Sequence, residues 1–183
     1  MKAPIPQDEE ARLERLRQYQ VLDTAAEQAF DDITKMGADI CQTPVSLLTF
    51  VDRNRQWFKS NIGLSAKETS RDVAFCAHAI LQPDLFVVPD ALADERFAKN
   101  PLVTHDPNIR FYAGMPLVTE DGHALGTLCV LDRVPRELTQ DQLNKIKVLA
   151  KSALLLLEMR RSPATDRSSA HGNSALLFRK TLR

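Results

Sequence analysis

Hydrophobic and polar positions are most informative in the segment 109–132, which predicts two strands joined by a tight turn. Both arms are rich in apolar residues, and Glu120-Asp121-Gly122 separates them. Asp-Gly between apolar runs is a strong hairpin signal, because both residues tolerate the positive φ that tight turns require. The second arm, 124–131, is almost entirely small or apolar, so we expect a strand buried on both faces at the centre of a sheet.

The same reading of apolar spacing predicts the remaining elements. Helices are expected over residues 8–20, 25–42, 73–81 and 139–161, and strands over 45–51, 56–60 and 85–88. Asp23 or Thr24 is expected to cap the second helix, and Thr139 with Gln142 has the pattern of a capping box. Residues 61–72 are predicted to form a loop. Residues 91–108 are predicted to form a long irregular connection with at most a helical turn near 95–99, and connections of this length are usually functional or mobile.

This order of elements predicts an α+β fold. We expect an antiparallel sheet of about five or six strands, with the terminal helices on one face and loops and short helices on the other. The chain has 183 residues, of which 44% are hydrophobic, enough for one well-buried core. We predict an N-terminal helix over 1–21 that could serve dimerisation, one domain over 22–161 that includes the last helix, and a disordered tail over 162–183.

The last helix carries an apolar pattern typical of helix pairing. Its apolar positions alternate by three and four residues, at Leu143, Ile146, Ala150, Ala153 and Leu157. Leu149 and the run 154–156 make another side apolar as well, and a helix apolar on nearly all sides must be covered on both. The sheet can cover one side and a second copy the other, so we predict a homodimer. Packing on the first helix of the same chain is the alternative.

Charge and cysteine content narrow the partners and the compartment. Lys plus Arg and Asp plus Glu number 24 each, so no overall positive field favours nucleic acid. The longest apolar run, 153–157, is far too short to span a membrane, and the N-terminus lacks the apolar region of a signal peptide. Three widely spaced cysteines do not form a disulfide framework. We therefore expect a cytoplasmic protein with reduced thiols.

Several short motifs, in their order and spacing, resemble the GAF domain, a sensory α/β fold. They are Phe75-Cys-Ala-His78, Val88-Pro-Asp90, Asp94-Glu-Arg-Phe97, Arg110-Phe-Tyr-Ala-Gly114 with Pro116, and Gly126-Thr-Leu-Cys129 with Asp132. The resemblance covers roughly residues 22–160. It implies a small-molecule pocket between the sheet and the short helices and loops of one face. It also implies dimerisation through the first and last helices, which pass a signal to an output.

The leading hypothesis is a non-catalytic sensory domain of bacterial signal transduction. The resemblance implies a histidine kinase or a diguanylate cyclase as output, acting in trans or carried by another part of a longer protein, because nothing after residue 161 resembles either. The candidate pocket residues are Trp57, Phe58, Phe75, Cys76, His78, Asp90, Phe97, Arg110 and Tyr112. A ligand of unknown identity is expected, with no other cofactor, no metal and no catalytic residue.

Two features of these candidates leave alternatives open. Trp57 and Phe58 are adjacent in a strand, so one faces the core and the other the opposite side. Arg110 is expected to pair with a carboxylate and hold the long loop closed, since buried charges need partners. Its planar guanidinium would also suit an anionic group of the ligand.

Thiol and pigment chemistry are the other hypotheses. A methionine sulfoxide reductase or thiol sensor of this family would use Cys76, but the resemblance places a second reactive thiol within 91–115, where the chain has none. A bilin photoreceptor would need a cysteine after Asp94, and the first one there is Cys129 in the predicted central strand. The histidines, such as His105 and His123, show no spacing typical of metal ligands.

Overall fold

The structure is a computed structural model that describes residues 2–160. Its elements in chain order are α1 (Glu9–Gln18), α2 (Gln28–Cys41), β1 (Val45–Val51), β2 (Arg55–Ile62), β3 (Glu68–Ser70), η1 (Arg71–Val73), α3 (Phe75–Ala79), β4 (Phe86–Val88), α4 (Pro101–Thr104), β5 (Phe111–Val118), β6 (Ala124–Asp132) and α5 (Gln140–Arg160). The disordered tail predicted for 162–183 lies outside the described residues.

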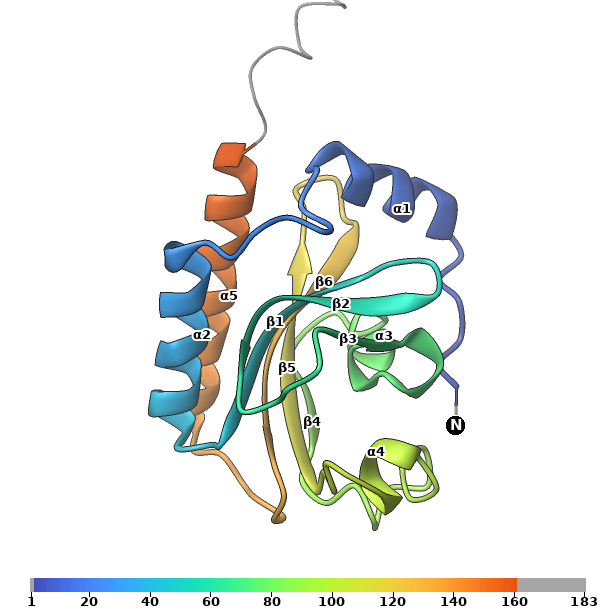
Figure 1. Ribbon diagram of the computed structural model, residues 1–183, viewed down its shortest axis with the longest axis vertical. Coiled ribbons are helices and arrows are strands. Elements are labelled where there is room, and N and C mark those ends of the chain that lie inside the picture. Colours follow the sequence, from blue (N-terminus) through green and yellow to red (C-terminus); the bar gives the residue numbers. More distant parts are fainter. Residues whose placement is uncertain (1, 161–183) are drawn as a thin grey trace, which may run out of the picture.

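The strands form one six-stranded sheet in the order β3-β2-β1-β6-β5-β4, and every neighbouring pair is antiparallel. The predicted α+β fold with a central antiparallel sheet is confirmed (Figure 1). The Asp-Gly hairpin is also confirmed: β5 and β6 pair directly, and Gly122 in their turn has a φ of 90°. β6 lies beside β1 in the middle of the sheet, and all but its first residue are buried.

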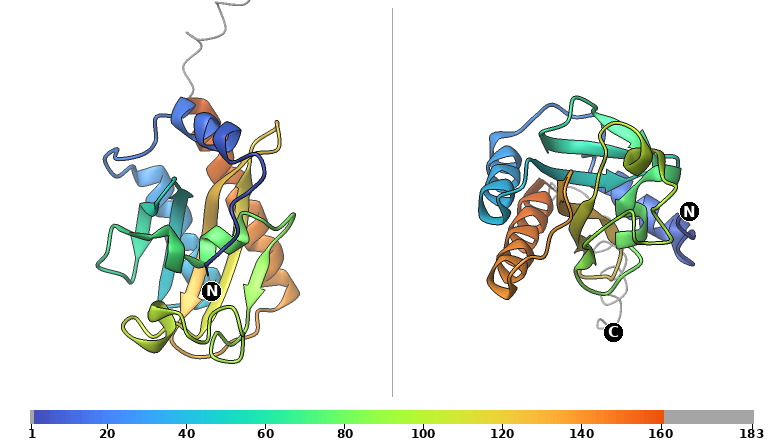
Figure 2. Two further views of the ribbon diagram at one scale, coloured as in Figure 1. Left: turned by 90° about the vertical axis from the view of Figure 1, so that its right-hand side faces the viewer. Right: turned by 90° about the horizontal axis from the view of Figure 1, so that it is seen from below.

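Helices α2 and α5 lie side by side on one face of the sheet (Figure 2). The buried side of α5 includes Ile146, Ala150, Ala153 and Leu157, which are four of the five positions of the predicted apolar seam. The seam therefore packs inside this chain, against the sheet and α2. The predicted capping box of α5 forms, since the Thr139 amide donates to Gln142 Oε1 and the Gln142 amide donates to Thr139 Oγ1.

The first helix differs from its predicted position. α1 crosses one end of the sheet rather than lying wholly on the face of α2 and α5 (Figures 1 and 2). Its C-terminal part reaches that face, where Leu16 and Tyr19 pack in the cluster under α2 and α5 and the Tyr19 hydroxyl donates to Glu158 of α5. Arg12 of α1 is only 1% exposed and forms an ion pair with Glu9, which also accepts a hydrogen bond from Arg71. These paired charges are buried between α1 and the rest of the fold. α1 is therefore held by a buried polar contact as well as by the apolar side chains of Leu13 and Leu16.

Most other differences concern short elements. The predicted loop 61–72 contains β3, and the predicted irregular connection 91–108 contains α4, which begins at a proline after an Asn100 cap. The helix predicted over 73–81 is shorter, and neither Asp23 nor Thr24 caps α2, because that helix begins only at Gln28. Thr24 instead donates to the Val21 carbonyl oxygen. Such one-turn elements depend on tertiary contacts more than on local apolar spacing.

The face opposite α2 and α5 is covered by α3, α4 and the loops that join them. A buried apolar cluster fills this face, with side chains from β1, β5, β6 and α3. None of the helices within residues 2–160 combines the length and the apolar character that crossing a bilayer requires.

Candidate ligand pocket

A cavity of about 190 Å³ lies on the face of the sheet that carries α3 and α4. Its lining comes from the five strands β1, β2, β3, β5 and β6, from α3, and from the segments around residues 64–66 and 102–109. The lining residues are Leu47, Gln56, Phe58, Leu64, Ser65, Ala66, Thr69, Phe75, Cys76, Leu102, Asp106, Pro107, Ile109, Tyr112, Cys129 and Leu131. Ser65, Ala66 and Asp106 are exposed, so the cavity opens to solvent between these two loop segments.

Strand alternation explains how the floor of the cavity arises. Leu47 and Cys129 are register partners on β1 and β6, and Leu131 lies two residues further along β6, on the same face. The residue between the two β6 positions, Val130, points the other way and packs with Ile146 of α5. β6 therefore contacts the cavity with one face and the long terminal helix with the other.

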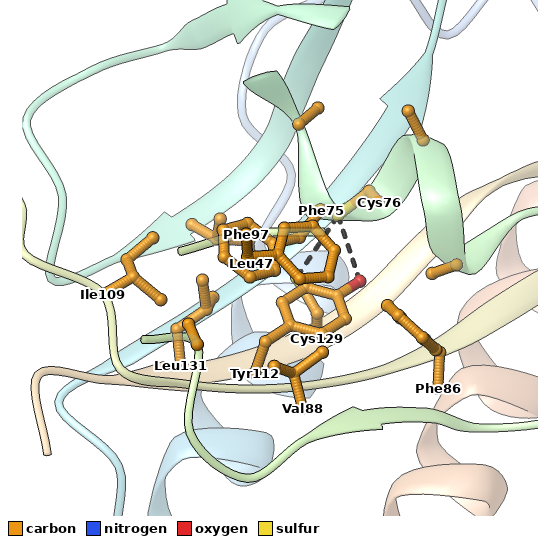
Figure 3. Packing of buried hydrophobic residues seen from close by; sticks show 14 of the residues in the cluster. Leu47, Phe75, Cys76, Phe86, Val88, Phe97, Ile109, Tyr112, Cys129 and Leu131 are labelled. Carbon is orange, nitrogen blue, oxygen red and sulfur yellow. Dashed lines mark hydrogen bonds between the residues drawn. The ribbon is translucent and has the colours of Figure 1, made fainter. Parts of the chain in front are cut away.

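Aromatic rings stack at one side of the cavity (Figure 3). The Phe75 ring lies parallel to Phe97 at a centroid distance of 4.1 Å and stacks on Tyr112 at 5.3 Å. The His78 ring meets the edge of Phe97 at 4.8 Å. Phe75 and Tyr112 line the cavity, whereas Phe97 and His78 form a layer behind them.

Two polar side chains face this mainly apolar space without a partner among the described residues. Gln56 is 5% exposed, and its carboxamide forms no hydrogen bond there. The Thr69 hydroxyl is buried and also lacks a hydrogen-bond partner. The two residues are register partners on β2 and β3, so they lie side by side. Buried polar groups are nearly always satisfied, so the Thr69 hydroxyl requires a partner that a bound molecule could supply, and the neighbouring Gln56 carboxamide adds a donor and an acceptor.

A second polar cluster lies at the base of the cavity around Cys76. Its Sγ accepts hydrogen bonds from the Thr127 hydroxyl at 3.0 Å and the Tyr112 hydroxyl at 3.3 Å, and it lies 3.8 Å from Cys129 Sγ. Burial alone would raise the pKa of Cys76, but hydrogen bonds from Cys129, Thr127 and Tyr112 lower it to about 7. Burial and the neighbouring Cys76 raise the pKa of Cys129 well above its usual value.

Of the nine candidate residues, the structure places Phe58, Phe75, Cys76 and Tyr112 in the cavity wall. Trp57 lies on the other side of β2, in the cluster under α2 and α5, as the alternation of adjacent strand residues requires. Asp90 lies away from the cavity and accepts a hydrogen bond from the Leu92 amide.

The expected pairing of Arg110 with a carboxylate is wrong. The Arg110 guanidinium donates to the carbonyl oxygens of Val103, at 2.7 Å, and Ile109. It therefore holds the loop near the cavity through backbone acceptors, and Arg110 is not part of the cavity lining. Asp132 pairs with Arg136 instead.

Sequence reasoning missed Gln56, Thr69 and Cys129 as parts of the site. Cys129 was predicted to lie in a buried strand, and nothing local indicated that it faces Cys76, 53 residues away. Strand alternation gave one usable signal, since Gln56 and Phe58 are two apart on β2 and share a face.

A wider depression lies between α2 and β2, but the most buried polar groups of its lining are paired. Lys59, whose side chain is fully buried, donates to Thr24, to the Ala25 carbonyl and to Glu27. Ser60 donates to Asp31 across the same depression. The cavity under α3 is therefore the better candidate for a ligand.

Known proteins match both the sequence and the fold. The family model described as GAF domain matches residues 25–156. A cyclic di-GMP phosphodiesterase of Pseudomonas aeruginosa is 45% identical over 133 residues, which cover 73% of this chain and 23% of that protein. The chain thus spans about a quarter of the length of this relative.

Two solved structures share the fold at low identity. The GAF domain of a phosphoenolpyruvate-protein phosphotransferase from Coxiella burnetii has a TM-score of 0.62 and 16% identity, covering 82% of this chain and 94% of that one. The PixJ GAF domain of Thermosynechococcus elongatus, in its blue-light absorbing form, has a TM-score of 0.58 and 16% identity, covering 89% of this chain and 98% of that one. At such identities the likeness shows the fold alone.

Proposed function

Since this chain belongs to the GAF domain family, we propose that it is the sensory module of a bacterial signalling protein and binds a small molecule in the cavity under α3. The observation that carries this proposal is an apolar space lined by the buried, unpartnered Thr69 hydroxyl and by the carboxamide of its register partner Gln56. Such a combination of apolar walls and few convergent polar groups is typical of ligand sites.

The size of the cavity limits the ligand. A dry cavity of about 150 Å³ in another protein holds benzene, so about 190 Å³ suits a molecule of one ring or two small fused rings. The ligand we propose has an apolar ring and a neighbouring donor and acceptor, which would meet Gln56 and Thr69. A linear tetrapyrrole is far larger, so the cavity does not favour a bilin.

We propose a regulatory rather than a catalytic role, with an output in cyclic di-GMP turnover. The support is the relative from Pseudomonas aeruginosa, whose name is that of a cyclic di-GMP phosphodiesterase. β6 offers the physical route, because Cys129 and Leu131 face the cavity while Val130 packs on α5. A ligand acts through this route only if it binds two arrangements of these elements with different affinities.

The test has two measurements on the full chain. Small molecules released from purified protein are identified by mass spectrometry, and single-ring amides such as benzamide are titrated while amide chemical shifts are followed. We expect a bound compound or shift changes confined to the cavity residues. Ala66→Trp places a large ring at the exposed rim and should abolish binding with little effect on folding, because Ala66 lies on an exposed loop.

Gln56→Met serves as the matched variant inside the cavity. It keeps the side-chain length but removes the amide, and replacing an unpartnered buried polar group costs little stability. We expect the affinity for an amide ligand to fall about tenfold while the melting temperature is retained. Retained binding in both variants, or no binding of any compound to the parent protein, would contradict the proposed pocket.

A further inference from the structure

Two thiols from distant parts of the chain meet at the base of the cavity. Cys76 lies on α3 and Cys129 on the central strand β6, and their Sγ atoms are 3.8 Å apart. Both are free, and both belong to the cavity lining although neither is more than 1% exposed. The cavity is therefore the route by which a small solute reaches them.

The surroundings of Cys76 suit a thiolate. The hydroxyls of Thr127 and Tyr112 both donate to its Sγ, as Figure 3 shows for Tyr112. A neutral thiol is a weak hydrogen-bond acceptor, whereas a thiolate is stabilised by several hydrogen-bond donors that converge on it. Thr49 lies behind this group, 3.3 Å from Thr127 between the two hydroxyl oxygens, so the cluster extends from β6 to β1.

The third cysteine has the opposite environment. Cys41 lies on the other side of the sheet, in an apolar cluster with Phe111 and Ile146, and it does not line the cavity. Burial raises the pKa of the Cys41 thiol to about 11. The chain thus contains an internal control: one buried thiol surrounded by donors at a cavity, and one surrounded by hydrocarbon.

We propose that Cys76 and Cys129 form a peroxide-sensitive dithiol that closes to a disulfide beneath the ligand cavity. The Cys76 thiolate attacks one oxygen of a peroxide, the O–O bond breaks, and the other oxygen leaves as water after taking up a proton. The resulting Cys76 sulfenic acid is attacked by the Cys129 sulfur, which loses its proton. An S–S bond forms and a second water leaves, so two thiols and one hydrogen peroxide give one disulfide and two waters.

Closure would change the ligand cavity. A disulfide brings two sulfurs to about 2.05 Å, well inside the 3.8 Å observed, so the Cys76 and Cys129 side chains must turn toward each other and Cys76 must leave its present hydrogen bonds. Phe75 precedes Cys76 on α3 and forms part of the cavity wall. Oxidation is therefore expected to alter ligand affinity, and this consequence rests on the proposed function, whereas the dithiol chemistry does not.

The test uses the full chain, reduced and freed of reductant. It is exposed to a small excess of hydrogen peroxide, then alkylated under denaturing conditions and analysed by mass spectrometry. We expect loss of two hydrogens and a cross-linked peptide pair containing Cys76 and Cys129, with Cys41 alkylated. This experiment involves no ligand. A negative result would therefore overturn the dithiol proposal without affecting the small-molecule proposal, which is tested by the binding measurements above.

Cysteine variants locate the attacking thiol. Cys129→Ser should stop the reaction at a Cys76 sulfenic acid that dimedone traps, Cys76→Ser should leave Cys129 unreacted, and Cys41→Ser should behave as the parent protein. Tyr112→Phe tests the donor: oxidation of Cys76 should slow roughly five- to tenfold near neutral pH. That difference should vanish at alkaline pH, where the thiolate forms without help. The titratable groups that face Cys76 are Tyr112 and Cys129.

If a variant fails to fold, oxidation of the parent protein still tests the proposal. Oxidation of Cys41 as fast as Cys76, or a folded protein that forms no Cys76–Cys129 disulfide, would overturn the proposal. A disulfide that appears only after denaturant is added would do the same.

Discussion

Gly114 gives Tyr112 the space that the thiol cluster requires. The two residues are two apart on β5 and share a face, and a Cβ at Gly114 would lie 2.1 Å from the Tyr112 hydroxyl oxygen. The phenol ring lies between Phe75 and Phe86, whose centroids are 5.3 and 5.9 Å away, so it has little room to move aside. The absence of a side chain at Gly114 therefore lets the Tyr112 hydroxyl lie over the strand and reach Cys76.

Gly114→Ala should consequently destabilise the protein and disturb Cys76 together. We expect a loss of about 1–3 kcal/mol in the free energy of unfolding, typical of overpacking a core, and slower peroxide oxidation of Cys76. Urea denaturation and the mass assay measure the two effects. In a Tyr112→Leu background the same substitution should cost much less. An equal cost in both backgrounds would show that the phenol is not the cause.

The aromatic residues and Cys76 of the site could be predicted from residue type, whereas Gln56 and Thr69 could not. Phe58, Phe75, Cys76 and Tyr112 are in the wall, and their types already indicated a buried pocket face. Gln56 and Thr69 read as ordinary polar residues of a surface strand and a loop. Their lack of partners is a property of the assembled fold, which local spacing does not encode.

At the scale of elements, α1 is held by a buried charge network. The Glu9 carboxylate pairs with Arg12 at 2.8 Å and accepts a hydrogen bond from Arg71, and both guanidinium groups are almost fully buried. Burial would raise the pKa of Glu9, but the hydrogen bonds and charges of the two arginines lower it to about 2. Removing the carboxylate would leave two buried cations without a counter-charge.

Glu9→Gln should therefore lower the free energy of unfolding by about 3 kcal/mol at pH 7. The folded pKa of Glu9, about 2, lies below the ordinary value of 4.5 for a glutamate, so this stabilisation is fully present above pH 4.5 and is lost as the pH falls toward 2. Urea titrations of parent and variant at several pH values should show a difference that shrinks over that window.

The neighbouring Glu10 provides the control on the same helix. It is exposed and pairs with Arg53 on the surface, where ion pairs contribute little. Glu10→Gln should leave stability almost unchanged. If the two substitutions had the same effect, α1 would be held by its apolar contacts rather than by the Glu9 network.

The elements themselves were predictable where local chemistry is strong. The Asp121-Gly122 turn and the Thr139–Gln142 capping box both form as expected, because each depends on residues within four positions of one another. The position of α1 was not predictable. Its sequence shows a thin apolar stripe on a charged helix, and only the fold reveals that Arg71, 62 residues away, completes the charge network.

At the scale of the whole molecule, the surface of α5 decides how two copies could meet. The apolar seam is the side of α5 that this chain covers, since Ile146, Ala150, Ala153 and Leu157 are buried. Another strip remains apolar and exposed. Val148, Leu155 and Met159 are 63, 65 and 81% exposed, and with Ser152 between them they follow a spacing of four, three and four residues. This is the period of paired helices.

A homodimer of this protein, if it pairs through α5, should therefore form through this exposed strip. We expect sedimentation velocity to show a concentration-dependent monomer–dimer equilibrium up to about 200 µM. Leu155→Glu should shift it toward monomer at least about tenfold, because a charge would replace a side chain whose burial contributes about 1.5–3 kcal/mol. Val134→Glu is the matched control, since Val134 is also exposed but lies in the loop before α5. A parent protein that stays monomeric, or a control that dissociates as readily as Leu155→Glu, would show that α5 does not pair two copies. In that case, a structural change caused by ligand binding in the cavity would have to be transmitted through β6 and α5 of a single chain.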